Sequence, residues 1–334
     1  MDKRERVEAA LTGKKLDRVP VSAWGHFFNK EVTVDGFVSS MLDFQEHYDW
    51  DYMKMQARYT YHFEDWGAVV TQSGRPGDWP VIEKLPVTRP EDWTRLRIQK
   101  PREGVLGSMI HAAEGIRVGL GGKTPCIMTV FSPLMIAHMM AGDTTGTLLR
   151  HLREERESLK AGMEVIAETF RLFVAELRKT GIDGIFYATK QANDDFMGAA
   201  EYQAFARPYD EQVLSAAKGF PFVMLHLCMD KIHLKEMADY PVTMVHWDPT
   251  LKGNPSYTEA RALTGDRVAL GGGPSRPTLA QGSPAELKGE LKTILTDAGD
   301  RHFLLGPGCS VLIAETLEEN LRILRNAPEE YQDY

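Results

Sequence analysis

The sequence predicts a single (β/α)8 barrel, and three observations support this fold class. The chain has 334 residues, a length that α/β barrels commonly reach as one domain. Short runs of β-branched and apolar residues alternate with longer amphipathic stretches, as expected for buried parallel strands and the helices that cover them. A doubly wound sheet is the alternative, but such a sheet often has a glycine-rich phosphate loop after its first strand, and this chain has none there.

The alternating pattern yields eight predicted strands. They are residues 18–24, 51–56, 126–131, 184–189, 222–227, 242–247, 268–273 and 302–307. Helices are predicted over 145–179, as one helix or two, then after residue 201, over 284–298, and from about Thr316. Ser283 is the expected N-cap of the third of these helices, and Thr316, followed by Glu319, that of the last.

Residues 57–125 interrupt the regular alternation between the second and third strands. They contain the turn sequence Ser73-Gly-Arg-Pro-Gly77 and several further prolines, which break regular elements. We expect a long insertion, a hairpin plus helices, that caps one end of the barrel within a single domain of residues 1–334.

The composition excludes several classes of protein. Hydrophobic residues make up 43% and charged residues 26% of the chain, and the formal net charge is −8. The absence of a basic stripe argues against a nucleic-acid partner. No apolar run approaches the roughly 18 residues of a membrane span, and the first residues are too polar for a secretory signal, so we expect a cytosolic (cytoplasmic) protein. The oligomeric state stays open, a homodimer included.

Three cysteines, Cys126, Cys228 and Cys309, are too few and odd in number for a disulfide framework. Cys126 lies in an apolar run and is expected to be buried.

His226 and Cys228 end the fifth predicted strand two residues apart, so both side chains can point to the barrel axis. Cys309 follows the eighth strand, and the strand ends of a barrel converge. One imidazole and two thiolates suit Zn²⁺. The alternative is that both cysteines only pack and that His226 is a general acid or base.

Further polar residues follow the same strand ends, where barrel enzymes carry their catalytic groups. His246 and Asp248 are candidates for a fourth metal ligand, for residues that orient the ligands, or for a hydrogen-bonded pair without a function. The glycines that end the seventh strand would let a ligand approach backbone N–H groups, or form a tight turn. The candidates for substrate or cofactor binding are Trp24, His26, Lys190, Gly272, Gly273 and Arg276.

At this point the sequence resembles the uroporphyrinogen decarboxylase superfamily, over nearly its whole length. The resemblance is carried by residues 4–13 with 17–21, by 181–184, by 205–209, and most specifically by 305–309 with 316–321. It implies a (β/α)8 barrel. True uroporphyrinogen decarboxylases have an arginine-containing motif after the first strand, whereas residues 22–28 here contain no arginine.

The other branch of that superfamily contains methyltransferases that move a methyl group from a corrinoid protein to a thiol such as coenzyme M. Their zinc ligands, a His-x-Cys pair and a later Gly-Cys, match His226, Cys228 and Cys309. The match departs after Cys228, where Met229 and Asp230 stand in place of a small residue.

The resemblance therefore implies a zinc-dependent methyltransferase that acts on a small-molecule methyl acceptor, with a cobamide cofactor carried by a partner protein. His246 and Asp248 would orient ligands or shuttle protons. The alternatives are a decarboxylase of a tetrapyrrole or small carboxylate, with Arg276 and Lys190 binding carboxylates, and a non-catalytic cobamide- or tetrapyrrole-binding protein.

Overall fold

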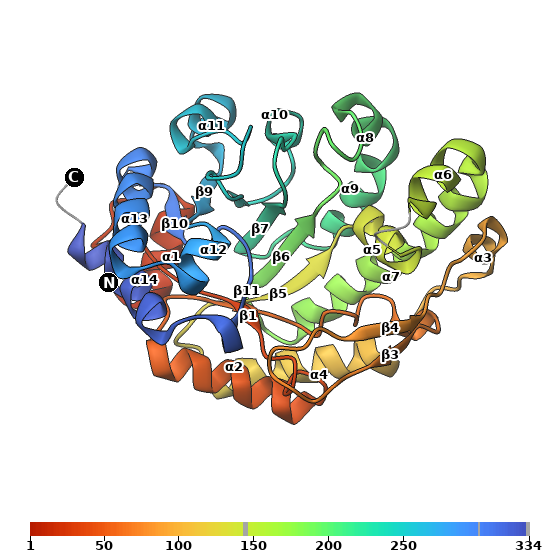
Figure 1. Ribbon diagram of the computed structural model, residues 1–334, viewed down its shortest axis with the longest axis horizontal. Helices are drawn as coiled ribbons and strands as arrows, with labels where there is room; N and C mark the ends of the chain where they lie inside the picture. The colour runs from red at the N-terminus through yellow and green to blue at the C-terminus, as the bar shows by residue number, and fades with distance from the viewer. Residues whose placement is uncertain (143–145, 300, 332–334) are drawn as a thin grey trace.

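The computed structural model of the chain describes residues 1–142, 146–299 and 301–331. Seven parallel strands form one curled sheet in the order β10-β9-β8-β7-β6-β5-β2, with helices around its outside (Figure 1). Their bounds are Met53–Met55 (β2), Cys126–Phe131 (β5), Gly184–Thr189 (β6), Phe222–Leu227 (β7), Met244–His246 (β8), Ala269–Gly272 (β9) and Phe303–Leu305 (β10). The predicted α/β barrel is confirmed, and β5, β6 and β7 have the predicted bounds.

The first predicted strand, residues 18–24, is wrong as a regular strand. Between β10 and β2 the chain forms a single parallel bridge, from Val21 to Leu305. Leu305 N–H donates to the Pro20 carbonyl, and Ser22 N–H donates to the Leu305 carbonyl. Pro20 has no N–H to offer, and the Val21 N–H donates to the Asp51 side chain, so the ladder cannot extend. The barrel nevertheless closes at this bridge.

Two short strands lie beyond the closing bridge, and two lie in the insertion. Gly25–His26 (β1) pairs in parallel with Val311–Leu312 (β11). Val69–Thr71 (β3) and Val81–Lys84 (β4) form an antiparallel hairpin.

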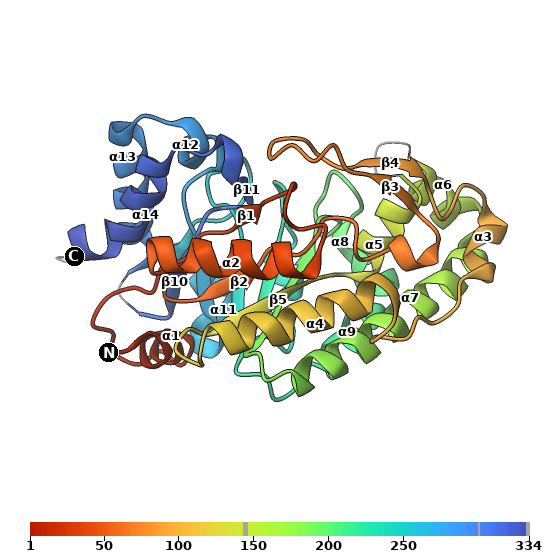
Figure 2. The same ribbon diagram turned by 90° about the horizontal axis from the view of Figure 1, so that it is seen from below.

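The helices complete the (β/α) alternation. Their bounds are Lys3–Leu11 (α1), Val34–Tyr48 (α2), Pro90–Arg95 (α3), Gly104–Gly119 (α4), Pro133–Met140 (α5), Thr147–Glu154 (α6), Arg156–Lys179 (α7), Ala199–Phe205 (α8), Arg207–Ser215 (α9), Leu234–Met237 (α10), Tyr257–Thr264 (α11), Arg276–Gln281 (α12), Pro284–Ala298 (α13) and Glu318–Glu330 (α14), with 3-10 turns at Glu64–Trp66, Gly265–Arg267 and Ile313–Glu315. Neighbouring helices pack around the barrel, as α2 and α4 do in Figure 2.

Most of the predicted helices are present. The stretch 145–179 holds two helices, α6 and α7; residue 145 itself lies outside the described residues. Ser283 caps α13 in a capping box with Glu286. Thr316 does not cap the last helix: α14 begins one residue later than expected, after Leu317, and the Thr316 hydroxyl donates to the Leu312 carbonyl instead.

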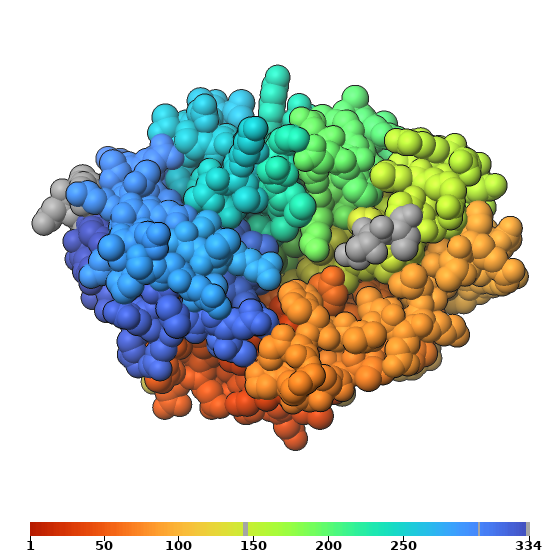
Figure 3. Space-filling view, viewed as in Figure 1, coloured from red at the N-terminus to blue at the C-terminus, as the bar shows by residue number. Residues whose placement is uncertain are grey.

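Residues 57–125 divide between two places in the fold. The turn after β3 brings Trp79 against Phe28 and His26, with ring centroids 4.7 and 5.7 Å apart, so the hairpin lies over the end of β1. Helix α4 instead packs against α2 on the outer wall. The face in Figure 3 is hollowed where the orange hairpin region meets green and blue segments from the middle and the end of the chain. In the described part of the chain, no helix has the length and apolar character needed to cross a membrane.

Candidate metal centre

His226, Cys228 and Cys309 come together at the carboxyl ends of two strands. His226 is the fifth residue of β7 and Cys228 is the first residue after it, whereas Cys309 lies in the short loop between β10 and β11. One ligand atom from each residue lies within 4.8 Å of the others. The two sulfurs are 3.9 Å apart. Among the described residues, this is the cluster of histidine, cysteine and carboxylate side chains with the spacing of a metal site.

The His226 ring has one nitrogen occupied and one without a partner. Its Nδ1 lies 2.8 Å from His246 Nδ1, and its Nε2 is buried without a hydrogen-bond partner. Burial, followed by the neighbouring His226, holds the pKa of His246 well below its ordinary value. His246 is therefore neutral, and its Nδ1 can accept a hydrogen bond from the Nδ1–H of His226. That bond leaves a lone pair on His226 Nε2, the form that binds a metal.

The two sulfurs have opposite tendencies to ionise. A hydrogen bond from Cys228 holds the pKa of the Cys309 thiol well below its ordinary value, and the neighbouring His226 ring acts in the same direction, although burial opposes this shift. The same Cys228–Cys309 bond, together with burial, raises the pKa of Cys228. Backbone N–H groups of Met229 and Ser310 face the sulfurs and favour their thiolate forms. Without a metal, the pair thus shares one proton.

These residues fit a zinc ion. The donor set is one imidazole nitrogen and two sulfurs, which zinc prefers, and a set of three protein ligands is typical of catalytic zinc because it leaves one position open. The unpartnered Nε2 of His226 supports this fit. Buried polar atoms are nearly always paired, and a bound metal ion would give this nitrogen a partner. Neither His246 nor Asp248 belongs to the cluster of ligand atoms.

Asn254 holds the loop that carries Cys228, and Asp248 lies against the loop that carries Cys309. Burial raises the pKa of Asp248, whose Oδ1 accepts from both the N–H and the hydroxyl of Thr250. A Cβ at Gly308 would lie 2.6 Å from Asp248 Cγ, so the Cys309 loop passes the carboxyl only because residue 308 is glycine. Asn254 Nδ2 donates to the carbonyls of Met229 and Asp248 at 2.9 and 2.8 Å.

Aromatic rings form the inner wall beside the histidines. Phe186 of β6 stacks on His226 with centroids 5.1 Å apart. Trp24 packs against Phe186 at 5.8 Å and against His246 at 5.3 Å. The structure thus places the predicted pocket residue Trp24 next to the cluster, while Phe186 was not predicted.

A buried polar chain, also not predicted apart from His26, runs from β2 to the loop after β1. Lys54 Nζ donates to Gln56 Oε1, Gln56 Nε2 lies 2.8 Å from His26 Nε2, and His26 Nδ1 lies 3.0 Å from Glu31. All four residues are buried, each at most 5% exposed. The signal that could have found Lys54 is its position between two methionines in a strand whose other residues are buried.

The remaining predicted binding residues lie in three different settings. Lys190 follows β6, and its positive charge acts on Cys228, so it lies near the cluster. Gly272 and Gly273 pack against the protein's own backbone: a Cβ would meet the Trp247 carbonyl at the first and the Gly306 carbonyl at the second. Arg276 is exposed at the start of α12. Ligand binding by these residues stays a prediction.

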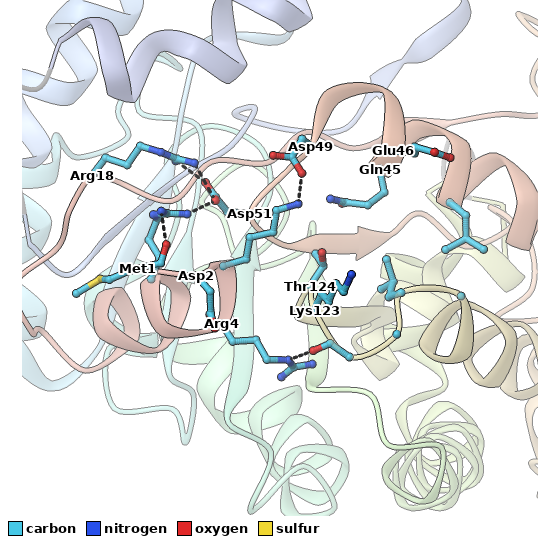
Figure 4. Close-up of a pocket in the computed structure, with 17 residues that line it drawn as sticks. Met1, Asp2, Arg4, Arg18, Gln45, Glu46, Asp49, Asp51, Lys123 and Thr124 are labelled. Atoms are coloured by element: carbon cyan, nitrogen blue, oxygen red, sulfur yellow. Dashed lines mark hydrogen bonds and ion pairs between the residues drawn. The ribbon is translucent and has the colours of Figure 1, made fainter.

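A separate pocket of about 1000 Å³ lies at the opposite end of the barrel, near the chain's first residues (Figure 4). Its charged groups are largely paired with one another, as Asp51 is with Arg6 and Arg18. None of the predicted site residues lines it. The amino-terminal end of a barrel is the end where ion pairs and packing serve stability rather than catalysis.

A protein-family model described as uroporphyrinogen decarboxylase (URO-D) matches residues 2–331. The chain is 23% identical over 259 residues to the methylcobamide:CoM methyltransferase MtbA of Methanosarcina acetivorans, which covers 76% of this chain and 72% of that protein. It is 27% identical over 222 residues to the uroporphyrinogen decarboxylase of Alcanivorax borkumensis, which covers 62% of this chain and 60% of that protein.

Among solved structures, a methyltransferase from Methanosarcina mazei superposes with a TM-score of 0.85 at 20% identity, over 99% of both chains. A B12-independent methionine synthase from Shewanella sp. W3-18-1 gives a TM-score of 0.56 at 13% identity, over 89% of this chain and 86% of that one. At these sequence identities the superpositions show a shared fold and nothing about function.

Proposed function

Because the chain belongs to the uroporphyrinogen decarboxylase family, we propose that it is a zinc-dependent methyltransferase that moves a methyl group between a corrinoid and a thiol. The family relatives of this enzyme include both methyltransferases and decarboxylases. The name of one relative specifies methylcobamide and CoM, which supports a corrinoid, carried by a partner protein, as one substrate and a small thiol as the other.

One observation carries this proposal. The Nε2 atom of His226 is buried without a hydrogen-bond partner, and the same residue belongs to a cluster with two sulfurs whose ligand atoms lie within 4.8 Å of one another. A decarboxylase that works without metal has no need of two converging thiols. The donor set instead suits a metal that binds soft ligands.

A zinc ion held by His226, Cys228 and Cys309 would supply an open coordination position that lowers the pKa of a bound thiol. The chain's own residues prepare that position. His246 keeps the His226 ring in one tautomer, and Trp24 and Phe186 keep the inner side apolar. Asp248, protonated more readily than an ordinary carboxyl because it is buried, lies beside the Cys309 loop and can hold the proton that an incoming thiol releases.

The rival within the family is decarboxylation of a tetrapyrrole or of a small carboxylate. It is favoured by the match to a uroporphyrinogen decarboxylase. It is disfavoured by the exposed position of Arg276 and by the absence of arginine among residues 22–28, which leaves a substrate with many carboxylates without counter-charges near the first strand.

Metal content by mass spectrometry tests the proposal first. We expect about one zinc per chain in the purified protein, and its loss in Cys228→Ser and in Cys309→Ser. Cys126→Ser is the matched control, because Cys126 is buried away from the cluster in β5 and should leave the zinc in place. Methyl transfer from methylcobalamin to a thiol is then the assay. A protein that holds no zinc after reconstitution, or one that decarboxylates uroporphyrinogen instead, would overturn the proposal.

A further inference from the structure

Tyr202 belongs to a buried group of three tyrosines that share one carboxylate. Their hydroxyls donate to Asp210 in α9, and they come from β6, from α8 and from the segment after α10: Tyr187, Tyr202 and Tyr240. All four residues are at most 3% exposed. Within the described residues, the hydroxyl of Tyr202 also lies 3.3 Å from that of Thr189, a contact that neither of the other two tyrosines makes.

The direction of the hydrogen bond between Tyr202 and Thr189 follows from the number of hydrogens. Burial raises the pKa of Asp210 to about 6, so this carboxyl is ionised at neutral pH. A phenol has one hydrogen, and it points to Asp210 Oδ2 at 2.9 Å, because a carboxylate is a stronger acceptor than a hydroxyl. The Thr189 hydroxyl therefore supplies the hydrogen of the second bond. Asp210 and Tyr202 thus fix the direction in which the Thr189 side chain points.

Thr189 is the last residue of β6, and it supports Cys228 in two ways. Its carbonyl accepts the N–H of Cys228 at 2.9 Å, at the end of the ladder between β6 and β7. Its hydroxyl oxygen accepts the N–H of Gln191 at 3.3 Å, which closes the turn that contains Lys190. The positive charge of Lys190 favours the thiolate of Cys228. A different orientation of Thr189 would therefore move both the backbone beside Cys228 and a charge that acts on its sulfur.

Cys228 depends on support of its backbone because the chain turns sharply after it. Met229 has a φ of 81°, a conformation that is unfavourable for a residue with a side chain. On that side, Asn254 Nδ2 donates to the Met229 carbonyl at 2.9 Å. On the other side, the group that holds the chain is the Thr189 carbonyl. These two bonds together determine where the Cys228 sulfur lies relative to the other two ligands.

We infer that Tyr202 is a positioning residue for the metal centre, which acts through Thr189 on the ligand Cys228. This inference rests on the proposed function, and it adds a residue outside the cluster to those that set the geometry of the metal. Partners that orient a ligand usually change metal affinity roughly 10- to 100-fold. We expect the lower end of that range, because two hydrogen bonds lie between Tyr202 and Cys228.

Substitution with cobalt tests the inference, because the visible bands of Co²⁺ report its coordination geometry and a thiolate-to-cobalt band reports its sulfur ligands. In Tyr202→Phe we expect shifted visible bands and an affinity for cobalt about tenfold below that of the wild-type protein. Tyr187→Phe and Tyr240→Phe are the matched controls. Each also removes one hydroxyl from Asp210, so a similar loss of stability is expected, but both should keep the wild-type bands and affinity.

Two substitutions of Thr189 test the path between Tyr202 and the metal centre. Thr189→Val removes the hydroxyl and keeps the shape of the side chain, and it spares a contact of Tyr202 with the Ser132 hydroxyl that Tyr202→Phe also removes. It should show the same shifted bands, and the double variant should bind cobalt no more weakly, since both changes break one hydrogen bond. Thr189→Ser keeps the hydroxyl and should keep the wild-type bands. Thr189→Val also replaces Tyr202→Phe as the test if the latter does not fold.

The outcomes separate this inference from the proposed function. If Tyr202→Phe keeps the wild-type bands, or if the two control variants shift them equally, Tyr202 does not position Cys228, while the metal centre stands. If the wild-type protein binds no cobalt, or binds it without a thiolate band, the cysteines are not ligands. That result would overturn both the inference and the proposed function.

Discussion

His226 and His246 face each other through their Nδ1 atoms at 2.8 Å, so a single hydrogen joins the two rings. Only one of two neutral rings can donate in such a pair. If His226 binds zinc through Nε2, its Nδ1 must be the donor and His246 the acceptor. His246 would thereby determine the tautomer of His226 without being a metal ligand itself. This role differs from that of a fourth ligand, which the sequence left open.

His246→Phe should weaken zinc binding roughly 10- to 100-fold, the usual effect of losing a partner that orients a ligand. His246→Gln, whose amide oxygen can still accept from Nδ1, should lose less. Competition with a chromogenic chelator measures both affinities. Unchanged affinity in His246→Phe would show that the ring does not orient His226, and complete loss of zinc in both variants would make His246 a ligand after all.

Removal of the metal should expose the Cys228–Cys309 pair to oxidation. The sulfurs are 3.9 Å apart, and the pKa of Cys309 lies below its ordinary value, so a reactive thiolate is present in the metal-free protein. Diamide should convert the pair to a disulfide in metal-free protein and leave zinc-loaded protein unreacted. Mass spectrometry of non-reduced peptides detects the bond. Cys126, buried with a pKa raised to about 12, is the internal control, and equal oxidation with and without zinc would argue against metal binding by this pair.

Asn254→Ala should both destabilise the protein and lower its affinity for zinc. Met229 has a φ of 81°, an unfavourable conformation for a residue with a side chain, and the Asn254 amide holds its carbonyl while the Asn254 oxygen accepts from Ile232 N–H at 3.2 Å. Loss of these bonds should cost about 1–3 kcal/mol in urea denaturation. Asn254→Asp keeps the acceptor but not the donors, so it should retain part of the stability. If Asn254→Ala has the stability of the wild-type protein, the loop that contains Met229 does not depend on the Asn254 hydrogen bonds.

Asp210 should make the protein's stability depend on pH. Its carboxylate accepts from Tyr187 at 2.6 Å and from Tyr202 and Tyr240 at 2.9 Å, yet burial dominates and raises its pKa to about 6. The raised pKa means that the folded state holds the proton more tightly than the unfolded state does. The stabilisation is thus fully present below the unfolded pKa near 4 and is lost as the pH rises through 6.

The comparison with Asp210→Asn isolates that dependence, because the amide does not titrate. Denaturation at several pH values should show the stability of the wild-type protein falling, relative to the variant, by up to about 3 kcal/mol between pH 4 and 7. A difference that stays constant over this range would mean that the three tyrosines keep the pKa of Asp210 at its ordinary value.

The sequence pattern predicted those parts of the fold that depend on local, repeated signals. Three strands, β5 to β7, consist of unbroken apolar runs, and the structure has them with the expected bounds. Residues 18–24 looked similar, but the extension of a strand there depends on its neighbours: Pro20 offers no N–H, and the Asp51 side chain takes the N–H of Val21. The position of Thr316 similarly depended on the competing Leu312 carbonyl.

The same distinction applies to the site. His226 and Cys228 could be recognised because they share a strand end, and Cys309 because barrel strands converge. Lys54 carried a weaker signal: its place between two methionines indicates that it is buried, but the groups that it contacts are known only from the structure. The glycines Gly272 and Gly273 are compatible with either ligand binding or a tight turn. The structure shows that both pack against backbone, and ligand binding there stays a prediction.

The closing bridge between Val21 and Leu305 also bears on how the protein is made. The ribosome adds residues at roughly 5–20 per second, so Val21 leaves the exit tunnel tens of seconds before its partner does. During that interval the backbone of residues 20–22, which pairs with Leu305 in the folded protein, is an unpaired edge that other strands can use as a template, the situation that favours aggregation. The buried pairs of Asp51 with Arg6 and Arg18 involve residues close to Val21 in the chain and can form early. The nascent chain can therefore hold its first segment against β2 until the last strand is synthesised.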